Sequence, residues 1–124
     1  MTILTWLFVY VLFLHWVGDF VLQTQYMAEN KSKNFEALVL HVFVYTCVLF
    51  IGTSVTTQYG INDLCRFAVI NFFIHLSVDA TTSRYTKMAL EAKNMHRFFA
   101  ILGFDQFVHA ATLLLTTFYL LGKP

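Results

Sequence analysis

Four long apolar runs constrain this chain more than any other feature of its sequence. Their approximate ranges are 2–26, 35–55, 62–83 and 98–121. A transmembrane α-helix needs about 20 predominantly apolar residues, and each run is of that length. We therefore expect an all-α fold: one four-span integral membrane domain over residues 1–124, built as a four-helix bundle with up-down topology.

The composition agrees with a membrane protein. Hydrophobic residues make up 58% of the chain and charged residues 12%, which is about half the charged fraction of an ordinary soluble domain. The formal net charge is only +1, and no dense cluster of Lys and Arg offers a surface for nucleic acid phosphates. The expected partner is therefore the lipid bilayer, and nucleic acid is excluded. The N-terminal run lacks the basic start and cleavage site of a signal peptide, so we interpret it as a mature span.

The positively charged residues are concentrated in two connections between the runs. Six of the eight Lys and Arg residues lie in the first and third connections, at Lys31, Lys33, Arg84, Lys87, Lys93 and Arg97. Positively charged loops tend to stay in the cytoplasm. Both chain termini are therefore predicted to lie on the non-cytoplasmic side.

The first run contains the polar pattern HWVGDFVLQ. It places His15, Asp19 and Gln23 at four-residue intervals, so that they share one helical face. A charged group near the centre of a span costs at least about 2.5–3.5 kcal/mol, which predicts that this face points into the bundle. The third run repeats the pattern as HLSVD with His75 and Asp79. This repeat suggests two helical hairpins related by pseudo-symmetry.

The other two runs add polar groups at a matching depth. The second contains His41, and the fourth contains Asp105 and His109. Counted from the basic connections at 1.5 Å per residue, these groups and Asp19 and Asp79 fall within a slab less than about 10 Å thick. No Lys or Arg lies at that depth by this count, so the three carboxylates are expected to lack a side-chain cation. The candidate metal ligands are His15, Asp19, His41, His75, Asp79, Asp105 and His109.

A set of imidazoles and carboxylates on facing helices is how helical bundles hold one or two divalent ions. These ligand types favour Zn, Mn, Fe or Ni, whereas Ca or Mg alone would not explain four histidines. If the chain is an enzyme, we expect metal-dependent hydrolysis of a lipid or lipid-linked substrate reached from the bilayer. The candidate catalytic residues are Asp19, Asp79 and Asp105. A homo-oligomer is compatible with such a small bundle.

Several alternatives stay open at this point. The same cluster can serve a proton or metal-ion transporter or channel component, or it can tie helices together by hydrogen bonds alone. Haem ligation by two histidines would leave the carboxylates unexplained. A small phage membrane effector of the holin or exclusion type would not need the His and Asp residues at all. A conduit should show polar residues continuing to both faces of the bundle.

Four segments of the chain resemble a family of bacterial and phage membrane proteins, the domain of unknown function 3307. They read HWVGDFVLQTQYMAENKSK, ALVLHVFVYT, NFFIHLSVDATTSRY and FDQFVHAATLLL. The motif residues are His15, Asp19, Gln23, His41, His75, Asp79, Asp105, Gln106 and His109. The resemblance implies a bacterial inner-membrane location but no activity. The His and Asp pattern is also distantly similar to that of small inner-membrane metal-dependent hydrolases, an analogy at the level of pattern.

Overall fold

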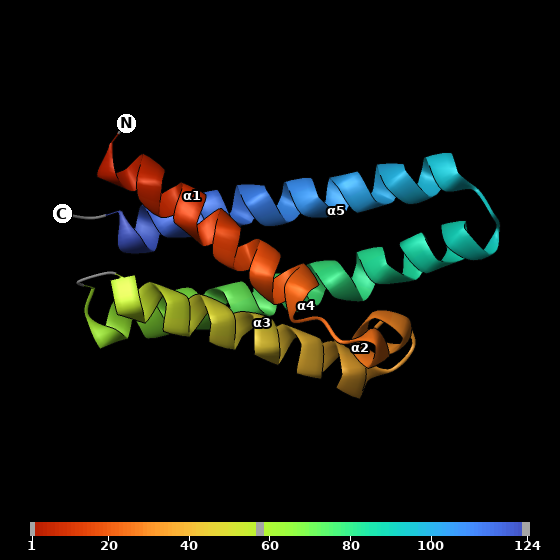
Figure 1. The fold of residues 1–124 in the computed structure, drawn as a ribbon, viewed down its shortest axis with the longest axis horizontal. Helices are drawn as coiled ribbons and strands as arrows, with labels where there is room; N and C mark the ends of the chain where they lie inside the picture. Colours follow the sequence, from red (N-terminus) through yellow and green to blue (C-terminus); the bar gives the residue numbers. More distant parts are fainter. Residues whose placement is uncertain (1, 57–58, 123–124) are drawn as a thin grey trace.

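The computed structural model describes residues 2–56 and 59–122, and within these ranges it contains helices and turns but no strand (Figure 1). The elements are α1 (Ile3–Trp16), η1 (Val17–Val21), α2 (Gln25–Asn30), α3 (Phe35–Thr56), α4 (Ile61–Glu91), α5 (Met95–Thr116) and η2 (Thr117–Leu121). Both η elements are π-helical turns that continue α1 and α5 directly. The predicted all-α fold is confirmed.

Four helical segments among the described residues are long and apolar enough to cross a membrane: Ile3–Val21, Phe35–Thr56, Ile61–Glu91 and Met95–Leu121. They correspond to the four predicted spans, so the chain is an integral membrane protein. The first span ends earlier than the sequence predicts, because Thr24 begins a new helix there. Its hydroxyl accepts a hydrogen bond from the backbone N–H of Met27 (3.3 Å), which caps α2.

The long helices alternate in direction along the bundle. In Figure 1 the start of α1, the end of α3, the start of α4 and η2 lie at one end, while α2 and the turn between α4 and α5 lie at the other end. We call the second end the basic end, because its connections contain Lys31, Lys33 and Lys93. The up-down order is that expected from short connections between antiparallel helices.

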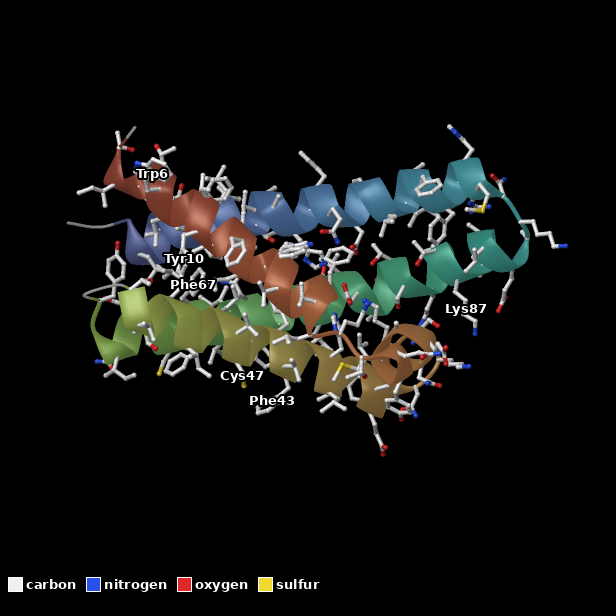
Figure 2. All side chains as sticks on the ribbon, in the orientation of Figure 1. Trp6, Tyr10, Phe43, Cys47, Phe67 and Lys87 are labelled. Atoms are coloured by element: carbon white, nitrogen blue, oxygen red, sulfur yellow. The ribbon has the colours of Figure 1, made fainter. Side chains whose placement is uncertain are left out.

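The bundle has apolar side chains outside and many polar ones inside. Phe43, Phe73 and Phe107 are each more than half exposed, and Figure 2 shows Phe43 pointing away from the helices. A buried apolar cluster fills the bundle toward the termini. It consists of Val11, Leu14, Tyr45, Leu49, Leu64, Phe67, Leu113 and Leu121. An apolar exterior of this kind suits lipid rather than water.

A close approach between η1 and α3 positions the polar part of the interior. A Cβ atom added at Gly18 would lie 3.1 Å from Tyr45 Cδ2 and 3.2 Å from Tyr45 Cα, so any larger residue would push the two helices apart by a few tenths of an ångström. The π-helical turn adds a residue to the helix here, as shown by the bond from Leu22 N–H to the Val17 carbonyl (2.9 Å). Together these features turn Asp19 toward α3.

This geometry predicts that Gly18→Ala destabilises the protein. The added methyl group meets the backbone of α3, and overpacking of this kind costs about 1–3 kcal/mol. Thermal unfolding in detergent, followed by circular dichroism, measures the effect as a lower melting temperature.

Gly103→Ala is the matched control, because a Cβ at Gly103 has no heavy atom within 4 Å. It should leave the melting temperature unchanged or raise it, since alanine is the better helix former by about 1 kcal/mol. Equal melting temperatures for the two variants would contradict the close approach.

Candidate metal centre

The predicted site residues are all buried and come from four separate spans. None is more than 7% exposed. They are His15, Asp19, His41, His75, Asp79, Asp105 and His109. The structure brings them to one region of the bundle, between the apolar cluster and the basic end.

Four of these residues form a compact group: Asp19 from η1, His41 from α3, and His75 and Asp79 from α4. His41 Nε2 lies 3.0 Å from Asp19 Oδ1 and 3.2 Å from Asp79 Oδ2. His75 Nε2 lies 3.2 Å from His41 Nε2, 3.4 Å from Asp19 Oδ1 and 3.6 Å from Asp79 Oδ2. We call these residues the four-residue group.

The four-residue group has more close polar contacts than its imidazole N–H groups can fill with hydrogen bonds. A neutral imidazole has one N–H, whereas Nε2 of His41 lies within 3.2 Å of two carboxylate oxygens and of Nε2 of His75. Nδ1 of His41 and of His75 has no hydrogen-bond partner among the described side chains and backbone, so both rings make their polar contacts at Nε2. Four ligands about 2.0–2.1 Å from a tetrahedral zinc ion would be about 3.3 Å apart. The spacing of 3.0–3.6 Å between each imidazole nitrogen and the other three atoms fits a cation at the centre.

A second possible ligand set shares one residue with the first. It consists of Asp19, Asp105 and His109, whose ligand atoms all lie within 4.8 Å of one another. His109 Nε2 lies 3.5 Å from Asp105 Oδ1 and 3.1 Å from Asp79 Oδ1. The Asp19 carboxylate therefore lies between two neighbouring sets of ligand atoms.

His15 lies beside these groups rather than within them. Its Nδ1 is 3.2 Å from the Tyr45 hydroxyl, and its Nε2 is 3.1 Å from Gln106 Oε1. Gln106 Nε2 in turn donates to Asp19 Oδ2 (3.2 Å) and Asp105 Oδ2 (2.9 Å). Both ring nitrogens of His15 are thus engaged, and Gln106 links His15 to two carboxylates. The sequence pattern placed Gln106 beside the site but did not reveal this bridging position.

The ring of His75 is held between two other rings. It stacks on Tyr45 with centroids 3.9 Å apart and on His109 with centroids 4.2 Å apart. The interplanar angles are 25° and 22°. Packing on both faces fixes the direction of His75 Nε2 toward the four-residue group.

The expectation that no Lys or Arg reaches this depth is wrong. Lys31 Nζ donates to Asp79 Oδ2 at 2.9 Å, and the Lys31 side chain is only 18% exposed. Lys31 follows α2 in the first connection, and its long aliphatic stem carries the ammonium group into the bundle. Counting residues along the helices gives the depth of the backbone only, so it could not show how far the Lys31 side chain extends into the bundle.

A cavity of about 170 Å³ adjoins the site on the side of the basic end. Asp19, Asp79 and Asp105 line it together with the apolar side chains of Phe20 and Leu102. We call this cavity the chamber. It gives a small molecule or headgroup room beside the carboxylates.

The family model described as "Protein of unknown function (DUF3307)" matches residues 7–123. The chain belongs to this family. The resemblance inferred from the four motifs is thereby confirmed. No curated protein and no solved structure matches the chain. The family description assigns no activity, so function has to be argued from the site, and the similarity to metal-dependent hydrolases stays a prediction.

The ion pair between Lys31 and Asp79 predicts that Lys31→Met destabilises the metal-free protein. Removing one partner leaves a buried carboxylate without its ammonium partner, at a cost of about 3–5 kcal/mol. The measurement is thermal unfolding of chelator-treated protein in detergent.

Lys33→Met is the control, because Lys33 is an exposed lysine two residues away. It should unfold at the wild-type temperature. If Lys31→Met also unfolds at that temperature, the ion pair contributes nothing to stability.

Proposed function

We propose that this chain is a membrane metalloprotein that holds a divalent ion with Asp19, His41, His75 and Asp79. The observation that carries the proposal is the convergence of two imidazole nitrogens and two carboxylate oxygens inside the bundle, where each imidazole nitrogen lies 3.0–3.6 Å from the other three atoms. Buried ionisable groups of this kind require a counter-charge. The neighbouring set containing Asp105 offers room for a second ion.

The charges near the group support a divalent ion. Metal-bound imidazoles are neutral, so the local charge comes from three carboxylates, Asp19, Asp79 and Asp105, and one ammonium group, Lys31. The sum is −2, which one divalent ion balances. Nitrogen and oxygen ligands without thiolate favour Zn, Mn, Fe or Ni.

The reaction class that suits the site best is hydrolysis of a lipid or lipid-linked substrate. A divalent ion bound here would polarise the scissile bond and supply an activated water. Asp105 lines the chamber outside the four-residue group, so its carboxylate is placed to accept a proton there. Thr82 Oγ1 and Gln106 Nε2 each donate a hydrogen bond to Asp105 and fix its orientation.

The position of the chamber supports a substrate from the bilayer. Its lining combines residues of η1 and α5, including Phe20 and Leu102, with the carboxylates. Phe20 is 43% exposed on the outer surface, so an acyl chain can lie against it while a polar group enters the chamber. We place the basic end on the cytoplasmic side of a bacterial inner membrane, following the positive-inside rule.

The packing toward the termini argues against a conduit. Leu49, Phe67 and Leu113 lie between the site and that end of the bundle and are at most 1% exposed. A channel needs a polar or wide path to both faces. Thr53, Asn71 and Thr117 are also buried in this half of the bundle, and Asn71 hydrogen-bonds to the Phe67 carbonyl and to Thr116. Close packing of the three apolar side chains suits a pocket that opens toward one end only. A membrane effector that acts by insertion alone would have no use for converging buried ligands.

The decisive test is elemental analysis of protein purified in detergent and loaded with zinc. Wild-type protein should retain at least one equivalent of zinc after dialysis. Asp79→Ala and His75→Ala should retain little, because each removes a ligand. Two variants keep the proposal testable if one of them folds poorly.

The matched controls are Asp63→Ala and His96→Ala, which change residues of the same types outside the site. The Asp63 side chain is 49% exposed, and His96 is exposed. Both should bind zinc as the wild type does. The proposal fails if wild-type protein retains no metal, or if well-folded Asp79→Ala and His75→Ala retain as much as these controls.

A further inference from the structure

A second and larger cavity lies next to the chamber at the basic end. Its volume is about 510 Å³, and it lies between the segment around α2 and the last turns of α4. Lys31, Ser83, Thr86 and Phe98 line both cavities. We call the second cavity the vestibule. The shared lining makes the two cavities one route from the basic end to the carboxylates.

The hydroxyl of Ser83 lines this route and has no hydrogen-bond partner among the described residues. Ser83 is 9% exposed. Neighbouring hydroxyls differ, because Thr86 Oγ1 donates to the Thr82 carbonyl at 2.9 Å. An unsatisfied buried donor costs free energy. An acceptor-rich ligand at the junction of the two cavities would satisfy it.

The charges along the route favour an anion. Lys31, Lys33 and Lys87 all line the vestibule, and Figure 2 shows Lys87 at the basic end. Two carboxylates, Glu29 and Glu91, also line it. Glu91 lies 3.6 Å from Lys87 Nζ, and Glu29 accepts a hydrogen bond from Gln25. With Lys31 included, the charged side chains that line the vestibule sum to +1, opposite in sign to the carboxylates in the chamber.

We propose that the junction of chamber and vestibule binds the phosphate group of the substrate. This inference rests on the metal centre proposed above. Lys31 Nζ can keep its hydrogen bond to Asp79 and also donate to the anion, because an ammonium group has three N–H donors. Lys31 Nζ, Ser83 Oγ and Lys87 Nζ supply the donors. Phosphate suits them better than carboxylate because it accepts from several donors at once. A phosphorylated lipid and a soluble phosphate ester share this group.

The test measures binding of inorganic phosphate to the zinc-loaded full chain in phosphatidylcholine nanodiscs by isothermal titration calorimetry. Zinc content is determined on the same samples. Ser83→Ala should weaken phosphate binding about ten-fold, the effect of one hydrogen bond to a charged group. It removes no contact within the protein, so the fold is preserved. Lys87→Gln should also weaken binding and reduce its dependence on salt.

Ser77→Ala and Arg84→Gln are the controls, since both residues are exposed on the same helix and line neither cavity. They should bind phosphate as the wild type does. A second set of nanodiscs contains phosphatidic acid. Competition by this lipid supports a lipid phosphate as the source, and undiminished binding supports a soluble phosphate ester.

The outcomes separate the two proposals. Zinc-loaded protein that binds no phosphate, or Ser83→Ala and Lys87→Gln that bind it as the controls do, overturns the phosphate site and leaves the metal centre standing. A wild-type sample that retains no zinc overturns the metal centre and this inference with it.

Discussion

Three carboxylates buried inside one membrane bundle set the main constraint on this structure. Asp19, Asp79 and Asp105 are each at most 7% exposed, in a surrounding where a charge without a partner is costly. Each carboxylate lies within 4 Å of an imidazole nitrogen, and Asp79 also binds the ammonium group of Lys31. The bundle is arranged so that every span delivers a polar partner to the same place. The proposed ion at the centre would complete this arrangement electrostatically.

Two features of the backbone position the ligands of the site. A glycine that lies against the α3 backbone and a π-helical turn together bring Asp19 to His41. Ring stacking then directs His75, and Gln106 ties His15 to two of the carboxylates. Toward the termini an apolar cluster closes the bundle, while two cavities open toward the basic end. This asymmetry gives the site one approach, past lysines and an unpartnered hydroxyl.

The sequence predicts the parts of this structure that depend on helical periodicity. Apolar run length gives the four spans, and four-residue spacing gives the pairs His15 with Asp19 and His75 with Asp79 on common faces. The sequence does not predict contacts that depend on the length and the rotamer of a side chain. Lys31 enters from a connection on a flexible stem, and the hydrogen bonds of His15 depend on which atoms Tyr45 and Gln106 present. Neither is encoded in a spacing, so the sequence could not show which of the seven residues lie together in the four-residue group.

In this account the bundle neutralises its buried carboxylates with an ion and admits a polar group from the basic end. The central claim is that two imidazoles and two carboxylates bind the same ion. X-ray absorption spectroscopy of the zinc-loaded protein tests it most directly. The account predicts four nitrogen or oxygen ligands at about 2.0–2.1 Å and the outer-shell scattering of two imidazoles, which falls when His41 or His75 is replaced. A zinc spectrum without imidazole scattering, or one unchanged by both substitutions, would contradict it.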